Sequence, residues 1–462
     1  MAADNDLRPG ARHPARVAIV GSGPAGFFVA ERLLKRREDL EIDLFDRLPT
    51  PFGLVRGGVA PDHPKIKSVT AVFDRIARDP RVSFFGNVEV GDALPLALLR
   101  EHYSATVIAT GAPDPAKLGI EGEALRGVHT ASDFVGWYNG HPDHRDLEFD
   151  FSDRHAVVIG HGNVAADVCR MLLTPVDELA KTDVAAHALE CLCTSRVRVV
   201  HLVGRRGPAQ AKFTNNELRE LGEIRGCATS VDPGDLVLDR ESERELAHPD
   251  GSVAARNVRI LAEFAARPGD AGARQLVLSF CRSPTAFVGG ARLAAVRLER
   301  NRLVGEAFRQ RAVPTGDIVE IPCGLAFTSV GSRGRGMPGA PFDEGSATVP
   351  NDRGRVIAGG SVVAGLYVAG WIKRGATGII GTNRADGTET ADSLLSDLPS
   401  LAGAPKPGAH AIRALLHARG IRATDYADWD RIDRAEQVLG AQKTKPREKF
   451  TRVGEMLDLL RE

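Results

Sequence analysis

The sequence has few cysteines, and none of them stands in a motif of redox or metal chemistry. The six are Cys169, Cys191, Cys193, Cys227, Cys281 and Cys323. No two of them have the C-x-x-C spacing of a redox-active dithiol, and no run has the spacing of iron–sulfur cluster ligands. We therefore expect free thiols, no bound metal and no redox disulfide.

An excess of charge of one sign and a long apolar run are also missing. The chain has 60 Lys and Arg against 60 Asp and Glu, so no overall field attracts it to nucleic acid or to an anionic membrane. No stretch approaches the roughly 18 uninterrupted apolar residues of a membrane-spanning helix. Residues 1–14 contain Asp4 and Asp6 and lack an apolar core. We therefore expect a disordered lead-in there, without a targeting signal, and a cytoplasmic protein.

The chain is long enough for more than one domain, and a dinucleotide-binding motif lies near its start. The chain has 462 residues, more than one ordinary core accommodates. In "VAIVGSGPAG" (17–26), an apolar strand runs into a G-x-G-x-x-G turn and a helix pattern. Such glycines let the backbone approach a pyrophosphate, which the helix N-terminus attracts. Asp46 follows Gly26 by 20 residues (46 − 26), where an acid binds a ribose hydroxyl. FAD and NAD would both fit.

The motif recurs in "VVIGHGNVAAD" (157–167), with Ala165 in the last glycine place. The strand that follows ends in "GRRGP" (204–208) instead of an acid. Arg205 and Arg206 suit the 2′-phosphate of NADP(H), which an acid would repel. A site for NADPH beside another dinucleotide site suggests hydride transfer from NADPH to a tightly held FAD.

Longer motifs resemble the adrenodoxin reductase family of ferredoxin–NADP reductases. They are "PFGLVRGGVAPDHPKIK" (51–67), "GHGNVAAD" (160–167), "LVGRRGPAQAKFTNNELREL" (202–221) and "GWIKRGATGIIGTN" (370–383). The resemblance covers the chain from about residue 15 to the end. It implies an α/β fold with two Rossmann-like dinucleotide-binding domains. The NADP-binding domain (113–330) would be inserted into a discontinuous FAD-binding domain (15–112 and 331–462).

The resemblance also implies two sets of binding residues. FAD would contact Gly21, Gly23, Pro24, Ala25, Gly26, Asp46, Leu54, Val90, Trp371, Gly378, Ile379 and Ile380. NADPH would contact Gly160, His161, Gly162, Asn163, Val164, Arg205, Arg206, Glu217 and, with its nicotinamide, Gly378. A helix opening near Gly378 would aim its N–H groups at the flavin and stabilise negative charge on its reduced form. His63 and Glu220 would form a catalytic pair that tunes the flavin and supplies a proton.

By the same resemblance, electrons pass from FAD to a small, acidic ferredoxin-type iron–sulfur protein. Basic residues close in sequence to the cofactor motifs are candidates for its docking: Arg56, Lys65, Lys67, Arg219 and Arg225. The chain departs from the family pattern at Asp46, where Glu is frequent, and at Ala376, where Pro is frequent. Gly57 replaces a common aromatic residue, which predicts looser packing near the flavin or altered docking.

Other functions stay open at this point. A non-catalytic NADP-sensing or interaction protein is one, and a flavin-dependent monooxygenase or NADPH oxidase is another. A disulfide reductase lacks its paired cysteines here, and a glutamate-synthase-like electron subunit lacks its N-terminal cluster ligands. An insert at 174–196 lengthens the second crossover, and the charged segment 232–275 shows no recognisable chemistry.

Overall fold

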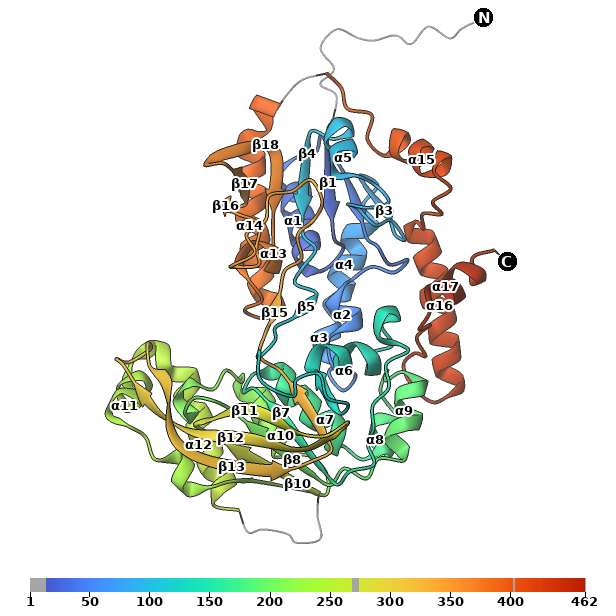
Figure 1. Cartoon of the computed structure of the whole chain (residues 1–462). Helices are drawn as coiled ribbons and strands as arrows, with labels where there is room; N and C mark the ends of the chain where they lie inside the picture. Colours follow the sequence, from blue (N-terminus) through green and yellow to red (C-terminus); the bar gives the residue numbers. More distant parts are fainter. Residues whose placement is uncertain (1–13, 268–273, 402–403, 462) are drawn as a thin grey trace, which may run out of the picture.

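The computed structural model describes residues 14–267, 274–401 and 404–461. Figure 1 shows two lobes, each built on a β-sheet and joined by two chain segments. The predicted lead-in lies outside the described residues, apart from Pro14. Among the described residues, no helix combines the length and the apolar composition that crossing a membrane requires.

The first lobe has a seven-stranded sheet in the order β16-β17-β18-β4-β1-β2-β3. Its strands are β1 (Ala15–Val20), β2 (Leu40–Phe45), β3 (Val82–Phe85), β4 (Ala105–Ile108), β16 (Asn351–Asp352), β17 (Arg355–Ala358) and β18 (Ser361–Val368). From β18 to β3 the strands are parallel, and β16 and β17 are antiparallel. Strand β1 is an apolar run because helices cover both faces of the parallel part.

The second lobe has a six-stranded parallel sheet in the order β6-β14-β7-β8-β10-β9. Its strands are β6 (Val128–Thr130), β7 (His155–Ile159), β8 (Val199–Val203), β9 (Cys227–Val231), β10 (Arg274–Ser279) and β14 (Leu325–Thr328). A three-stranded antiparallel sheet, not predicted from the sequence, lies on this lobe: β11 (Arg282–Gly289), β12 (Leu293–Val304) and β13 (Arg311–Pro322).

The second lobe is inserted into the first, as the resemblance implied. The first sheet takes its strands from 15–108 and 351–368, and all strands of the second come from 128–328. Where the chain passes between the lobes, β5 (Asp114–Pro115) pairs antiparallel with β15 (Ser332–Arg333). This pair lies close to the predicted domain limits, 112/113 and 330/331, which themselves stay a prediction.

Helices surround both sheets. Those of the first lobe are α1 (Pro24–Arg36), α2 (Leu54–Gly57), α3 (Pro64–Lys67), α4 (Thr70–Ala77), α5 (Leu96–His102), α13 (Trp371–Arg374), α14 (Ile380–Asp397), α15 (Ala409–Ala418), α16 (Tyr426–Gln442) and α17 (Val453–Leu459). Those of the second are α6 (Ala131–Tyr138), α7 (Asn163–Leu173), α8 (Val176–Leu179), α9 (Ala186–Cys193), α10 (Asn215–Leu221), α11 (Arg240–Ala247) and α12 (Ser252–Ala265). The insert at 174–196 contains α8 and α9.

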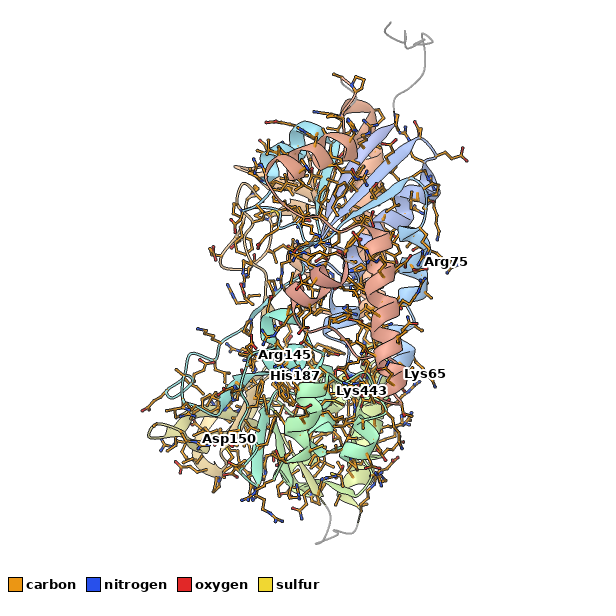
Figure 2. All side chains as sticks on the ribbon, turned by 90° about the vertical axis from the view of Figure 1, so that its right-hand side faces the viewer. Lys65, Arg75, Arg145, Asp150, His187 and Lys443 are labelled. Atoms are coloured by element: carbon orange, nitrogen blue, oxygen red, sulfur yellow. The ribbon has the colours of Figure 1, made fainter. Side chains whose placement is uncertain are left out.

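Helix α16 belongs to the first lobe, and the chain after it reaches the second. Trp429 of α16 packs in the core of the first lobe, with residues of β1 and α1. Farther along α16, the fully buried Glu436 accepts a hydrogen bond of 2.8 Å from Arg56. After the helix ends, Glu448 accepts from the backbone N–H of Ala186 at 3.0 Å. Figure 2 shows this arrangement, with Lys443 labelled near the lower end of α16.

A second buried ion cluster continues the connection. Asp183 of the second lobe accepts from Lys67 of α3 at 2.6 Å and pairs with Lys449 of the C-terminal segment at 3.1 Å. Burial lowers the pKa of Lys449 to about 7, although Asp183 opposes that shift. Three segments far apart in sequence therefore meet at the junction of the lobes through charges removed from water.

The buried pair at Glu436 is expected to contribute strongly to stability. Glu436→Gln leaves Arg56 without its charged partner, which destabilises the protein by about 3–5 kcal/mol, as for other broken buried pairs. Arg452→Gln is the matched control, since Arg452 also forms an arginine–carboxylate pair, but its pair with Asp146 has side chains 50% and 68% exposed. The control should cost about 1 kcal/mol or less. Urea unfolding measures both, and equal costs would contradict this account of the buried pair.

Candidate dinucleotide-binding and catalytic site

Each lobe has one helix that begins directly after a glycine turn, and the two turns are built alike. Gly21 (φ 110°) and Gly160 (φ 134°) lie in the left-handed region, and an added Cβ would overlap a carbonyl oxygen of a neighbouring strand end. Helices α1 and α7 follow, with Gly23 and Gly162 as N-caps and no side chain capping either helix. Their first N–H groups are thus available to an anion such as a pyrophosphate.

Asp46 is held in place beside the first turn. Its carboxylate accepts from the Ser22 hydroxyl at 2.5 Å, the Ser22 N–H at 3.1 Å and the Leu48 N–H at 3.0 Å. Burial raises the pKa of Asp46, and these hydrogen bonds oppose that shift. A carboxylate has about four acceptor positions, so three bonds leave one for the ribose hydroxyl that the motif predicts.

Large apolar side chains are exposed at three of the predicted cofactor contacts. Leu54 is 49% exposed, Val164 44% and Ile379 58%. Apolar side chains of this size are normally buried, so a group of them beside the glycine turns is typical of a ligand site. Flat cofactor rings packed on these side chains would remove that surface from water.

The C-terminal motif forms the predicted turn and helix start. Gly378 has a φ of 81°, and α14 begins two residues later, at Ile380. The Trp371 indole N–H donates to the carbonyl oxygen of Thr377 at 3.1 Å, which holds the intervening loop. The predicted helix opening is therefore present. Val90, another predicted contact, is almost entirely buried in the first lobe.

In the second lobe, two predicted NADPH contacts at the start of α7, His161 and Asn163, have their side chains bonded to the protein itself. His161 turns inward: its Nε2 lies 3.2 Å from the Leu202 carbonyl oxygen, and its ring packs on Phe280. Burial lowers the pKa of His161 to about 4, so the ring is neutral near pH 7. Asn163 accepts from the Thr214 N–H at 2.9 Å and ties the start of α7 to the loop before α10.

Arg205 and Arg206 follow β8, as predicted. Within the described residues, neither guanidinium forms a hydrogen bond or an ion pair. Burial and the charge of Arg205 lower the pKa of Arg206, so an anion between the two would be favourable. Arg206 also lines a cavity of about 660 Å³, whose other walls include Gln210, Lys212, Asn215, Glu245, Asp250, Val253 and Phe308. The segment 232–275, without a role in the sequence analysis, therefore supplies part of this wall.

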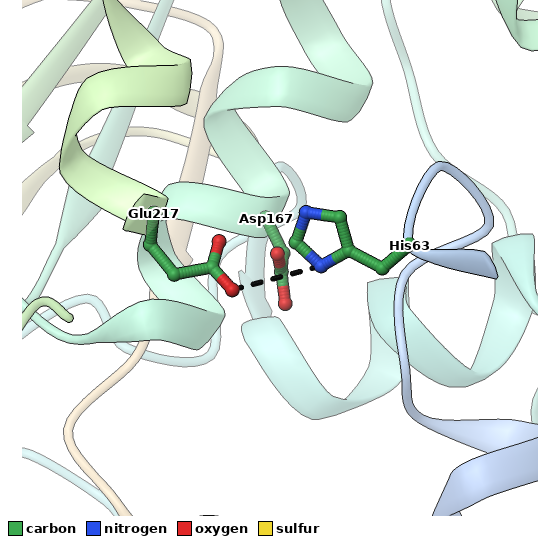
Figure 3. Close-up of side chains that lie close together, drawn as sticks. All are labelled: His63, Asp167 and Glu217. Atoms are coloured by element: carbon green, nitrogen blue, oxygen red, sulfur yellow. Dashed lines mark ion pairs between the residues drawn. The ribbon is translucent and has the colours of Figure 1, made fainter. Parts of the chain in front are cut away.

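His63 and Glu220 meet at the junction of the lobes. His63 Nε2 lies 2.8 Å from Glu220 Oε2, and His63 Nδ1 lies 3.6 Å from Glu217 Oε1. Figure 3 shows the imidazole reaching from the first lobe toward Glu217 and Asp167 of the second. One imidazole nitrogen of His63 and one carboxylate oxygen each of Asp167 and Glu217 lie within 4.8 Å of one another. The structure thus brings the predicted catalytic pair together, with Glu217, a predicted NADPH contact, on the other side of the ring.

Arg170 of α7 lies behind this group, and the sequence analysis missed it. The side chain is 4% exposed and donates to Asp62 at 2.9 Å, to Asp167 at 2.6 Å and to Glu217 at 2.7 Å. Burial raises the pKa of Asp167 to about 7, although Arg170 opposes that shift. Burial also acts to raise the pKa of Asp62, but Arg170 outweighs it and the net shift is downward.

Two groups of sequence expectations need correction. Arg56 and Lys67 are wrong as docking candidates, because their side chains are largely buried in the ion pairs described above. Arg225 is exposed but paired with Asp177 and Glu178, whereas Lys65 and Arg219 are exposed. The packing at Gly57 is not loose either, since an added Cβ would lie 3.0 Å from the ring of His141.

The second turn yields a prediction that separates binding from folding. No atom lies within 4 Å of a Cβ added at Gly162, whereas one added at Gly160 would meet the Ser329 backbone. Gly162→Val should therefore keep the thermal midpoint while its side chain occupies the pyrophosphate position and weakens dinucleotide binding at least about tenfold. Gly160→Val should lower the midpoint instead. Calorimetry and nucleotide titration measure both, and full binding by Gly162→Val would contradict the assignment.

Comparison with known proteins agrees with this arrangement. Residues 15–222 match the family model described as "Pyridine nucleotide-disulphide oxidoreductase". The six cysteines lie among the described residues, and all are free there.

Two relatives match over nearly the whole chain. Human "NADPH:adrenodoxin oxidoreductase, mitochondrial" is 44% identical over 458 residues, covering 96% of this chain and 92% of that protein. "NADPH-ferredoxin reductase FprA" of Mycobacterium tuberculosis is 44% identical over 456 residues, covering 96% and 98%. The solved structure "Mycobacterium tuberculosis FprA in complex with NADPH" matches with a TM-score of 0.91 and 43% identity, over 96% of this chain and 99% of that one. Together with the fold and both glycine turns, these similarities show that the chain belongs to the adrenodoxin reductase family of NADPH:ferredoxin reductases.

Proposed function

We propose that this chain is an FAD-containing NADPH:ferredoxin oxidoreductase. It takes two electrons together from NADPH and delivers them one at a time to a small iron–sulfur protein. The observation that carries the proposal is that each lobe has an uncapped helix start after a glycine turn, while two unpaired arginines accompany only the second. One nucleotide is then held as a resident cofactor and the other is recognised as a phosphorylated substrate.

The first lobe fits FAD. The turn at Gly21–Gly26, Asp46 and the exposed Leu54 would hold it on one side, and the loop before α14 on the other. When bound, FAD supplies a centre that accepts an electron pair and releases single electrons. With FAD bound there, the N–H groups at the start of α14 would place positive charge near the reduced ring.

The second lobe fits NADPH as the substrate. The N–H groups at the start of α7 bind its pyrophosphate, and Arg205 and Arg206 bind the 2′-phosphate through charge-assisted hydrogen bonds. NADH lacks that phosphate, so it would leave both guanidiniums unpaired. The arginines therefore select the substrate without taking part in the chemistry.

The junction handles the proton that accompanies reduction. His63 and Glu220 are within hydrogen-bond distance, so a proton can move between His63 Nε2 and Glu220 Oε2. The His63 side chain is only 9% exposed, and the Glu220 side chain is 40% exposed. The pair can thus keep a proton near the reaction.

The partner is proposed to be acidic, because unpaired basic side chains lie on the surface near the cofactor motifs. Lys65 and Arg219 are exposed. Figure 2 shows Lys65 near the lower end of α16. Opposite charge at this junction would speed and orient docking more than it would strengthen the final complex.

A cytoplasmic location, and a lack of nucleic-acid and membrane binding, stay predictions. The relatives named above include mitochondrial enzymes. Fractionation of the source cells followed by immunodetection would test the location.

The arginines give a prediction on substrate choice. Arg205→Gln and Arg206→Gln each remove a charge-assisted hydrogen bond worth about 1.5–3 kcal/mol, so each should raise the Kd for NADPH roughly ten- to one-hundredfold. The Kd for NADH should hardly change, which makes NADH the internal control. Titration of both coenzymes measures this. Equal losses for NADPH and NADH would place the arginines outside the 2′-phosphate site.

Turnover tests the proposed function as a whole. The purified protein should be yellow, and NADPH should bleach it and support reduction of an acidic ferredoxin far better than NADH does. Because docking is electrostatic, ferredoxin reduction should slow as salt rises from about 50 to 500 mM, over which the Debye length falls severalfold. Reduction of a small dye by the same protein is the control and should depend little on salt. A colourless protein that binds NADPH would instead be a sensor.

A further inference from the structure

The buried Arg170 is positioned to act on the His63–Glu220 pair from behind. A guanidinium has five N–H donor directions, and those of Arg170 are all directed at carboxylates. Its Nε and Nη2 bind Asp62, Nη2 also binds Asp167, and Nη1 binds Glu217. Nη1 lies 3.5 Å from Glu220 as well, an ion-pair contact. One cation therefore holds four acids that come from three segments of the chain.

Two of those acids are the ones that flank the imidazole. Glu217 faces His63 Nδ1 and Glu220 faces His63 Nε2, at 3.6 and 2.8 Å. A third, Asp62, precedes His63 in the chain, so its bond to Arg170 fixes the backbone that carries the ring. The position of His63 between the lobes thus depends on Arg170, which binds the acids beside the ring.

From this geometry we propose that Arg170 is the positioning residue of the proposed reaction's proton-transfer pair. It holds Glu217 and Glu220 on either side of His63 and shares their negative charge with the imidazole. This inference rests on the function proposed above for His63 and Glu220. Arg170 acts through these residues.

The charges around His63 fix the direction of the expected effect. The groups that face the cluster are Asp62 before α3, Lys67 on α3, Tyr138 on α6, Asp167 on α7, and Glu217 and Glu220 on α10. Without Arg170, four acids would surround His63, and Lys67, a cation on α3, is engaged with Asp183. The acids would then favour the imidazolium, and the pKa of His63 would rise.

The test compares two buried cations at the junction. Arg170→Gln removes the guanidinium and keeps an amide. Lys67→Met is the matched control, since Lys67 also connects the lobes but bonds to Asp183, which Lys449 still pairs with. In FAD-loaded protein with ¹³C-labelled histidine, His63 is identified as the resonance missing from His63→Gln, and its titration is followed by NMR.

We expect Arg170→Gln to raise the His63 titration midpoint by about one pH unit or more, which is the usual effect of removing a neighbouring charge. The pH profile of flavin bleaching by NADPH should shift in the same direction. Lys67→Met should lower the thermal midpoint but shift the His63 titration much less than Arg170→Gln does, because Lys67 is paired with Asp183. Adding Glu220→Gln to Arg170→Gln should reduce the shift, because one of the released acids is then neutral.

If Arg170→Gln does not fold, Arg170→Lys serves in its place. Lysine has three donors for four acids, so an intermediate shift is expected. The proposal would be overturned if the Arg170 variants lost stability as Lys67→Met does but kept an unchanged His63 titration. Arg170 would then be purely structural. The NMR titration needs no ferredoxin, so it stays interpretable even if the protein fails to reduce one.

Discussion

The relative position of the two lobes is the constraint on which the rest of the structure depends. Each lobe brings one glycine turn and one uncapped helix start, and neither is sufficient alone, because electrons must pass between the two bound nucleotides. The lobes meet through buried ion pairs: Arg170 with Asp62, and Lys67 with Asp183. These pairs are directional, so they specify one arrangement where apolar packing alone would allow several.

Burying so many charges costs desolvation energy, and the structure offsets it by giving each group several partners. Glu436 accepts from Arg56 and Arg447, and Asp183 pairs with two lysines. At the catalytic pair the balance is different, since one arginine serves four acids. The result is a local excess of negative charge around His63. The same residues that join the lobes therefore also set the charge around the proposed proton-transfer pair.

The local elements could be predicted from sequence wherever a motif is short and continuous. The strand, glycine turn and helix at Gly21 and at Gly160 follow from backbone sterics alone, and Arg205 and Arg206 follow from their place after β8. The contact of His63 with Glu220 came from family resemblance, because 157 residues separate the two in the chain. The domain limits and the binding role of each residue stay predictions.

Other features depend on tertiary packing that no local pattern reveals. Arg56 and Lys67 are wrong as docking residues, since proximity to a motif in the sequence does not show which way a side chain points. Arg170 did leave a signal: Asp167 and Arg170 are the charged residues of the otherwise apolar stretch "VAADVCRMLL" (164–173), a spacing typical of a buried pair on one helix face. The sheet β11–β13 is hard to predict because β13 is exposed along most of its length and its polar and apolar residues alternate only weakly.

The central claim is that an electron pair taken from one nucleotide leaves the other as single electrons. The most direct test is stoichiometry: a known amount of NADPH is added without oxygen to the FAD-loaded protein and excess ferredoxin, and the reduced clusters are counted by their absorbance. The account predicts two ferredoxins reduced for each NADPH consumed. NADPH consumption that leaves the ferredoxin oxidised would contradict it.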